Sequence, residues 1–265
     1  MTAPVELAPL ETLIREAARD ELVARFRRTS RHEKADGSWI TEADLAMQDR
    51  VKSALAARHP GIGFLGEEME AGEQQRLLDD SSGSGIWVLD PLDGTSNFAA
   101  GIPLFGVSLA LLQGGRIVAG IVYDPMHDES FAATLGGGAT LNGEALHARP
   151  AGIPIAKTTA CIDFKRLPPQ LATRIAATPP YSSQRSIGSV ALDWCWVAAG
   201  RFHLYLHGRQ RLWDYAAGSL VLAEAGGFSD TLDGTPAPPT LAPRSAVCAA
   251  DRGLFEEWCR YLRSG

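Results

Sequence analysis

The sequence predicts an α/β protein in which helices and a largely antiparallel sheet form the first half and helices and strands alternate in the second half. Three patterns indicate this fold class: apolar residues at helical spacing near the N-terminus, short apolar runs that stop at acidic residues, and alternating strand-like and helix-like segments in the last 115 or so residues. The chain has 265 residues, of which 45% are hydrophobic, so it is long enough to bury a large core.

Two helices are predicted before Pro60-Gly61. Apolar side chains three or four residues apart predict an amphipathic helix over residues 7–26. A second helix begins after Thr41, whose hydroxyl can accept a hydrogen bond from a backbone amide of the first turn. Its buried face consists of Met47, Val51 and Leu55, and Pro60-Gly61 lies beyond its end.

Strands are predicted next, and the first two end in acids. Residues 63–66 are followed by Glu67-Glu68, and residues 86–89 are followed by Asp90. Residues 107–112 and 117–123 flank Gln113-Gly114-Gly115 and predict a hairpin, and Asn142-Gly143 predicts a second tight turn.

A soft boundary near residue 150 divides the chain into an α+β half, residues 1–150, and an α/β half, residues 151–265. In the second half, residues 158–163 and 202–207 predict strands. Residues 189–199, 215–225 and 254–262 predict helices, the first two closed by Gly200 and by Gly226-Gly227.

Composition excludes several classes of function. A net charge of −6, without clustered Lys and Arg, argues against nucleic-acid binding. No segment approaches the ~20 apolar residues that cross a bilayer, and the N-terminus lacks a signal-peptide pattern. The four cysteines form no CxxC pair and are expected to be free thiols in a reducing compartment. We therefore expect a cytoplasmic protein.

The chemistry is concentrated in Asp90-Pro91-Leu92-Asp93-Gly94-Thr95, directly after the strand over residues 86–89. Two carboxylates three residues apart can bind a metal ion, and the amides after the glycine can face an anion. A bare DxxD is more often an acidic turn between a strand and a helix. Acids packed together, however, raise one another's pKa and destabilise the fold unless a cation balances them.

Two further segments make the pattern specific. Residues 66–68 (GEE), 90–98 (DPLDGTSNF) and 213–218 (WDYAAG) together resemble the inositol monophosphatase family, in a likeness that extends from about Lys34 to Gly227. The resemblance implies a layered αβαβα sandwich of the sugar-phosphatase type and a homodimer. It also implies Mg²⁺-dependent, lithium-sensitive hydrolysis of a small-molecule phosphate monoester.

The resemblance also implies roles for individual residues. Glu67, Asp90 and the carbonyl of Leu92 would bind one Mg²⁺, and Asp90, Asp93 and Asp214 a second, so that two or three metals serve the reaction. Thr95, assisted by Asp44, would orient the attacking water, and Asp93 completes the catalytic set. The predicted substrate contacts are Asp93, Gly94, Thr95, Ser189, His207 and Asp214.

Some of these positions admit a second interpretation. Asp44 lies three residues after Thr41 and can belong to a capping box at the helix start. Lys34 matches a basic residue near the site of relatives. His207 stands where inositol-hydrolysing relatives often have an acid, and Val190 and Arg209 also depart from their pattern. The identity of the substrate is therefore less constrained than the reaction.

Alternative functions remain open at this point. Within the family these are a 3′(2′),5′-bisphosphate nucleotidase, a fructose-1,6-bisphosphatase and a histidinol-phosphate phosphatase. A haloacid-dehalogenase-type phosphatase forms an aspartyl phosphate, but its acids are separated by one residue, whereas Asp90 and Asp93 are separated by two. A non-catalytic scaffold that binds a partner is the alternative from another class.

Overall fold

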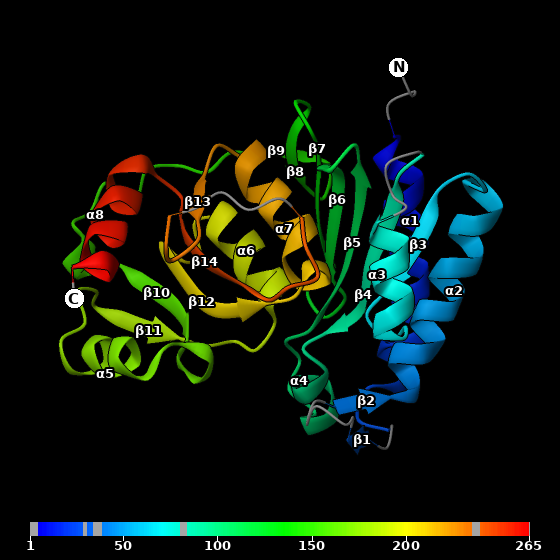
Figure 1. Cartoon of the computed structure of the whole chain (residues 1–265), viewed down its shortest axis with the longest axis horizontal. Coiled ribbons are helices and arrows are strands. Elements are labelled where there is room, and N and C mark those ends of the chain that lie inside the picture. The colour runs from blue at the N-terminus through cyan, green and yellow to red at the C-terminus, as the bar shows by residue number, and fades with distance from the viewer. Residues whose placement is uncertain (1–4, 29–30, 34–38, 80–83, 235–238, 265) are drawn as a thin grey trace.

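The computed structural model describes residues 5–28, 31–33, 39–79, 84–234 and 239–264. Five layers follow one another across the molecule (Figure 1). Helices α1 (Leu7–Glu21) and α2 (Glu42–Arg58) cover a seven-stranded sheet, and α6 (Val190–Ala198) and α7 (Leu212–Glu224) separate it from a five-stranded sheet. Helices α5 (Pro169–Ala177) and α8 (Arg252–Arg263) cover the far side. The predicted αβαβα sandwich is confirmed.

The seven-stranded sheet is largely antiparallel, as predicted. Its strands lie in sequence order, and only the first pair is parallel. They are β3 (Gly63–Gly66), β4 (Ile86–Asp93), β5 (Gly106–Gln113), β6 (Arg116–Asp124), β7 (Glu129–Thr134), β8 (Gly138–Leu141) and β9 (Glu144–Leu146). The predicted hairpin is β5–β6, and Asn142 and Gly143, both with positive φ, form the turn between β8 and β9.

The five-stranded sheet is mixed, in the order β11-β10-β12-β14-β13. Strand β10 (Thr159–Asp163) is parallel to both of its neighbours, β11 (Ser183–Arg185) and β12 (Leu204–Gln210). Strand β14 (Arg244–Ala249) runs antiparallel to β12 and to β13 (Phe228–Asp230). The sequence predicted β10 and β12, which turn out to carry one wall of the site.

Smaller elements complete the described chain. Strands β1 (Arg31–Glu33) and β2 (Trp39–Thr41) form a separate antiparallel pair. Helix α3 (Ala71–Asp79) follows β3, and the short helix α4 (Thr95–Ala100) follows β4. Single 3₁₀ turns occupy Val23–Arg25 (η1), Ile155–Lys157 (η3) and Phe164–Arg166 (η4).

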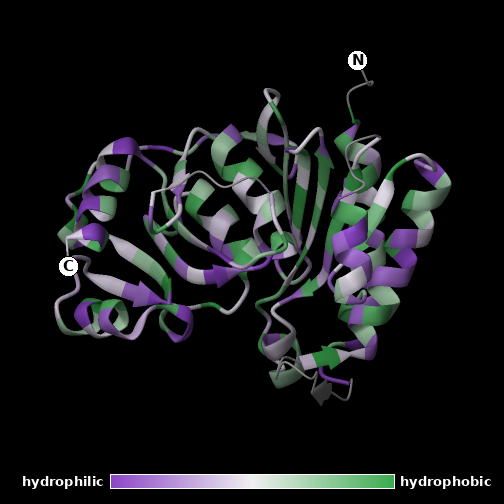
Figure 2. Ribbon diagram, viewed as in Figure 1, coloured by the Kyte–Doolittle hydropathy of each residue, from purple (hydrophilic) through white to green (hydrophobic). Residues whose placement is uncertain are grey.

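Three hydrophobic clusters fill the spaces between the layers. One joins α1 and α2 to the seven-stranded sheet, and another lies beneath α5 and α8. The middle cluster surrounds α6 and α7 and combines Val122 and Phe131 with Leu192 and Val221, so both sides of the boundary expected near residue 150 contribute to it. In Figure 2 the central strands are mostly hydrophobic, whereas the outer helices carry many hydrophilic residues.

Some predicted boundaries need correction. The helix expected over residues 7–26 ends at Glu21 and continues as the 3₁₀ turn η1. Helix α7 begins at Leu212 instead of residue 215, because the Asp214 carboxylate accepts a hydrogen bond from the Arg211 amide and caps the first turn. Asp214 therefore lies in the first turn of α7. Lys34 and part of the Pro-rich stretch at residues 236–243 lie outside the described residues.

The four cysteines are all buried and unpaired, as expected of free thiols. In the described part of the chain, no helix combines the length and the apolar character that a bilayer-spanning segment needs.

Candidate active site

A β-bulge brings the two acids of the DxxD segment to the same side of β4. Asp90 pairs with Ser108 of β5, but Asp93 pairs with Gly106, so three steps along β4 match two steps along β5. Residues three apart on a regular strand point to opposite faces, and one extra residue restores them to the same face. Pro91 has no amide hydrogen for the ladder and suits this position.

The third acid arrives from α7 in the second half of the chain. The buried Ser108 hydroxyl donates a hydrogen bond of 2.8 Å to the carbonyl of Trp213, the residue before Asp214. Since Ser108 is also the ladder partner of Asp90, this bond fixes the start of α7 beside the bulge. Ligand atoms of Asp90, Asp93 and Asp214 all lie within 4.8 Å of one another. We call these three residues the acid cluster.

Burial and mutual repulsion destabilise the charged forms of the acid cluster. Burial is the largest cause of a raised pKa for each of the three acids, and the neighbouring carboxylates, including Glu67, add to it. The pKa of Asp93 rises to about 6, and those of Asp90 and Asp214 rise well above their usual value. Convergent carboxylate oxygens under such repulsion are the donor set that a hard divalent cation such as Mg²⁺ prefers, so these residues fit a metal site.

Asp93 is also held from the second half of the chain. One of its carboxylate oxygens accepts hydrogen bonds from the Ser189 hydroxyl at 2.5 Å and from the Ala191 amide at 2.7 Å. Ser189 is the N-cap of α6 and is completely buried. The sequence predicted a substrate contact for Ser189, and the contact observed here is with the carboxylate of Asp93.

Asp44 makes contacts that suit both of the roles considered for it. One carboxylate oxygen accepts hydrogen bonds from the amide and the hydroxyl of Thr41 and closes the capping box of α2. The other oxygen lies 3.1 Å from the Thr95 hydroxyl, which also lies 2.9 Å from the Leu92 carbonyl. Burial raises the pKa of Asp44 to about 6 against the opposing effect of these hydrogen bonds.

One pocket of about 180 Å³ collects nearly all of the predicted site. Its lining includes Glu67, Asp90, Leu92, Asp93, Gly94, Thr95, Ser189, His207 and Asp214. Asp44 is not part of this lining and contacts the site through Thr95. Gly94, the N-cap of α4, has a φ of 95°, a value that favours glycine. Glu67 lines the pocket beside the acid cluster without belonging to it.

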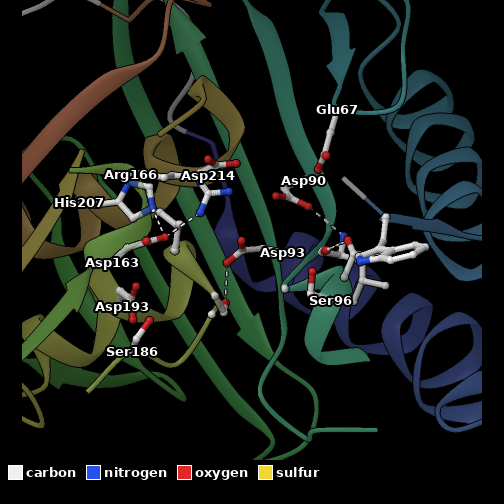
Figure 3. Close-up of a pocket in the computed structure, with 17 residues that line it drawn as sticks. Glu67, Asp90, Asp93, Ser96, Asp163, Arg166, Ser186, Asp193, His207 and Asp214 are labelled. Atoms are coloured by element: carbon white, nitrogen blue, oxygen red, sulfur yellow. Dashed lines mark hydrogen bonds and ion pairs between the residues drawn. The ribbon is translucent and has the colours of Figure 1, made fainter. Parts of the chain in front are cut away.

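Sequence reasoning missed several lining residues. Trp39, Ser96, Asp163, Arg166, Ser186 and Asp193 also face this pocket. Asp163 and Arg166 lie at the end of β10 and in η4, beside His207 on β12, across the pocket from Glu67 and Asp90 (Figure 3). The signal available in the sequence was weak: an acid directly after the apolar run at residues 160–162, the same pattern that marks Glu67 and Asp90.

Comparison with known proteins places this site in a family. The family model described as "Inositol monophosphatase family" matches residues 6–265. An inositol-1-monophosphatase of Mesorhizobium japonicum is 40% identical over 207 residues, which are 76% of this chain and 75% of the relative. A Nus factor SuhB of Pasteurella multocida is 34% identical over 199 residues, 74% of this chain and 72% of the relative.

Solved structures agree with this likeness. The Thermotoga maritima IMPase superposes with a TM-score of 0.83 at 25% identity and covers 97% of this chain and 95% of its own. A staphylococcal IMPase-II with inositol monophosphate bound gives a TM-score of 0.78 at 27% identity, covering 95% of this chain and 90% of its own. The same staphylococcal enzyme with 2′AMP bound gives a TM-score of 0.79 at 26% identity, covering 96% of this chain and 94% of its own.

Proposed function

The chain belongs to the inositol monophosphatase family, and from this premise we propose that it is a Mg²⁺-dependent phosphatase that hydrolyses a small phosphate monoester by direct attack of water. The observation that carries the proposal is the meeting of Asp90, Asp93 and Asp214 within 4.8 Å. The Thr95–Asp44 hydrogen bond lies at the edge of the same pocket.

The acid cluster, with Glu67 and the Leu92 carbonyl, would hold the metal ions. When bound, Mg²⁺ would balance the carboxylate charges, polarise the phosphoryl oxygens and lower the pKa of the attacking water. Ser189 and the Ala191 amide fix one oxygen of Asp93, which leaves its other oxygen to point into the site. This support from α6 keeps the carboxylate in one orientation during turnover.

Thr95 and Asp44 orient the nucleophile. The Thr95 hydroxyl has one hydrogen to donate, and the carboxylate of Asp44 is an acceptor for it at 3.1 Å. With that hydrogen directed at Asp44, the lone pairs of the Thr95 oxygen accept a hydrogen bond from the attacking water. The amides of Gly94 and Thr95 would bind the phosphate oxygens at the start of α4.

The substrate class is proposed from the relatives together with the pocket. One relative is named inositol-1-monophosphatase, and one solved neighbour binds both inositol monophosphate and 2′AMP. A pocket of about 180 Å³ suits a single small leaving group. We therefore propose small phosphate monoesters of the inositol phosphate type, with bisphosphate nucleotides, fructose bisphosphate and histidinol phosphate as competing candidates.

The family resemblance extends the proposal to three further properties. We propose that the protein pairs as a homodimer, that lithium inhibits it and that it acts in the cytoplasm. Sedimentation of the purified chain and inhibition by LiCl in the phosphatase assay test the first two of these.

A phosphate-release screen tests the proposed function. Purified protein is incubated with each candidate monoester in Mg²⁺ and in EDTA. We expect release that depends on Mg²⁺ for at least one ester, whereas a non-catalytic scaffold that binds a partner predicts none. Rapid quench with mass spectrometry tests direct water attack: a trapped phosphate on Asp90 or Asp93 would refute it.

A further inference from the structure

The pocket wall opposite Glu67 and Asp90 carries a second polar group, which the family pattern does not explain. Asp163 ends β10, Arg166 ends the turn η4, and His207 lies on β12. All three residues line the pocket, and Figure 3 shows them together on one side with the acid cluster between them and Glu67. We call Asp163, Arg166 and His207 the β10/β12 wall.

Strand pairing and one glycine assemble this wall. Strands β10 and β12 are parallel, and their register places Asp163 directly beside His207. The turn η4 then packs against β12 at Gly208, where a Cβ atom would collide with the carbonyl oxygen of Arg166. Because only glycine permits this approach, the turn brings the Arg166 side chain back to Asp163.

One oxygen of Asp163 contacts both other residues of the wall. Arg166 donates to Oδ2 at 2.7 Å, and Nε2 of His207 lies 3.2 Å from the same atom. The Arg209 amide donates to Nδ1 of His207, so Nδ1 is an acceptor and the imidazole hydrogen belongs on Nε2, which faces Asp163. No hydrogen bond to Oδ1 of Asp163 is found among the described residues, and 21% of this side chain is exposed.

The charge balance of the wall restricts what Oδ1 can bind. Burial raises the pKa of Asp163, but the adjacent imidazole of His207 and the hydrogen bond and charge of Arg166 outweigh it, so the net pKa lies below the usual value. The carboxylate is therefore ionised, accepts hydrogen bonds only, and has its charge balanced by Arg166. A cationic leaving group would meet Arg166, and a second phosphate would meet Asp163. A neutral hydroxyl, which donates a hydrogen bond, satisfies Oδ1 without either repulsion.

We propose that Asp163 is a substrate-binding residue whose Oδ1 accepts a hydrogen bond from a hydroxyl of the leaving group. The inference rests on the proposed function, because the leaving group lies at this wall only if the phosphate lies at the acid cluster. Arg166 and His207 act as positioning residues that hold Oδ2 and aim Oδ1.

A matched pair of esters tests this proposal. Glycerol 2-phosphate and isopropyl phosphate share one carbon skeleton and differ only in two hydroxyls. We measure kcat/KM for both esters, in Mg²⁺, for the wild type, Asp163→Asn and Asp49→Asn. The last variant makes the same chemical change at an exposed position of α2. The ratio of the two values cancels the active fraction of each preparation, so partial misfolding of a variant does not affect the readout.

We expect the wild type to prefer glycerol 2-phosphate and Asp163→Asn to lose roughly tenfold of that preference. The single amide oxygen would stay with Arg166 and His207, so an uncharged NH₂ group would face the hydroxyl in place of the carboxylate acceptor. Asp49→Asn should keep the wild-type ratio. An unchanged ratio in Asp163→Asn overturns the proposal. A higher kcat/KM of Asp163→Asn on fructose 1,6-bisphosphate with an unchanged ratio for the two esters also overturns it, because the β10/β12 wall would then bind a second phosphate. If the wild type releases phosphate from no candidate monoester in Mg²⁺, the proposed function itself fails, whereas hydrolysis of other candidates without any of glycerol 2-phosphate overturns only the role of Asp163.

Discussion

The pKa values of the carboxylates on the two sides of the pocket are shifted in opposite directions. In the acid cluster, burial and like charges raise the pKa values of Asp90, Asp93 and Asp214. In the β10/β12 wall, His207 and Arg166 lower the pKa of Asp163. On the first side a bound cation would balance the carboxylates, whereas on the second side Arg166 already balances Asp163. This difference agrees with the proposed function, which assigns metal and phosphate to the first side and the leaving group to the second.

The largest effect is expected on the acid-cluster side, from Asp93→Asn. Asparagine keeps a carbonyl oxygen that can accept the hydrogen bonds from Ser189 and the Ala191 amide, so the fold should survive. The loss of the negative charge should weaken metal binding and transition-state stabilisation, and kcat/KM should fall on the order of 10²-fold or more. Steady-state kinetics on a hydrolysed ester measure this fall, with circular dichroism to check the fold.

The conservative change Asp49→Asn is the control for Asp93→Asn, because it removes a carboxylate charge from the exposed surface of α2. Its activity should match the wild type. Activity of Asp93→Asn within a few-fold of wild type would contradict the assignment of Asp93 to the metal side.

A smaller loss is expected from Asp44→Asn, which tests the orientation of the water. One amide oxygen cannot replace both carboxylate oxygens, so the variant gives up either the Thr41 contacts or the Thr95 contact. We expect kcat to fall about tenfold, less than the roughly 10²–10⁴-fold that a positioned acid or base itself contributes, because Asp44 would act on the water only through Thr95. Rates at saturating substrate measure this effect.

Thr41→Ala distinguishes capping from catalysis. It removes the hydroxyl that completes the capping box but leaves the Thr95–Asp44 contact. Its cost should be about 1 kcal/mol of stability with kcat close to wild type. An equal loss of kcat in Thr41→Ala and Asp44→Asn would mean that Asp44 acts only by capping α2.

The two sides also differ in how far the sequence could predict them. The acids of β4 and α7 lie in short segments with distinctive neighbours, so the family resemblance could single out Asp90, Asp93 and Asp214, which the fold brings together. Even there, the bulge at Pro91-Leu92 that turns Asp93 toward Asp90 could not be read from strand alternation.

The β10/β12 wall depends on contacts that no local pattern encodes. Asp163 and His207 lie 44 residues apart and meet only because β10 and β12 pair in parallel with one particular register. Arg166 joins them because η4 packs against Gly208. The sequence therefore singled out His207, from its position before Trp213-Asp214, but not the residues that lie beside it.

A roughly tenfold effect is expected at this wall from His207→Glu, and the sequence alone predicted a shift in preference toward inositol phosphates. In the structure, a carboxylate at position 207 would face Oδ2 of Asp163, and the two negative charges would repel each other. The charge of Asp163 should therefore be removed for the full shift to appear. We expect the double variant His207→Glu/Asp163→Asn to show the shift more strongly than His207→Glu alone, with Mg²⁺ dependence unchanged. Ratios of kcat/KM across the candidate esters measure it. Equal effects on all esters would discard a specificity role for His207.

The smallest expected effect concerns stability and pH, and it follows from the opposite pKa shifts of the two sides. The pKa values of Asp44 and Asp93 are about 6 in the folded chain, against 3.8 ordinarily. A raised pKa means that the folded state binds more protons than the unfolded state between pH of about 4 and 6. Stability is therefore lost as pH rises through this window. The lowered pKa of Asp163 contributes stability that is lost only below its ordinary pKa, outside the window.

Metal binding should therefore restore more stability at pH 7 than at pH 5. At pH 7 the acids are ionised and repel one another, whereas at pH 5 Mg²⁺ must first displace protons. We expect the rise in Tm on replacing EDTA with Mg²⁺ to be larger at pH 7 by a few degrees, since about 1 kcal/mol corresponds to about 2–4 °C in a chain of this size. Asp93→Asn should reduce the difference between the two pH values, and Asp163→Asn should not. A larger Mg²⁺ effect at pH 5 would contradict the contrast between the two sides.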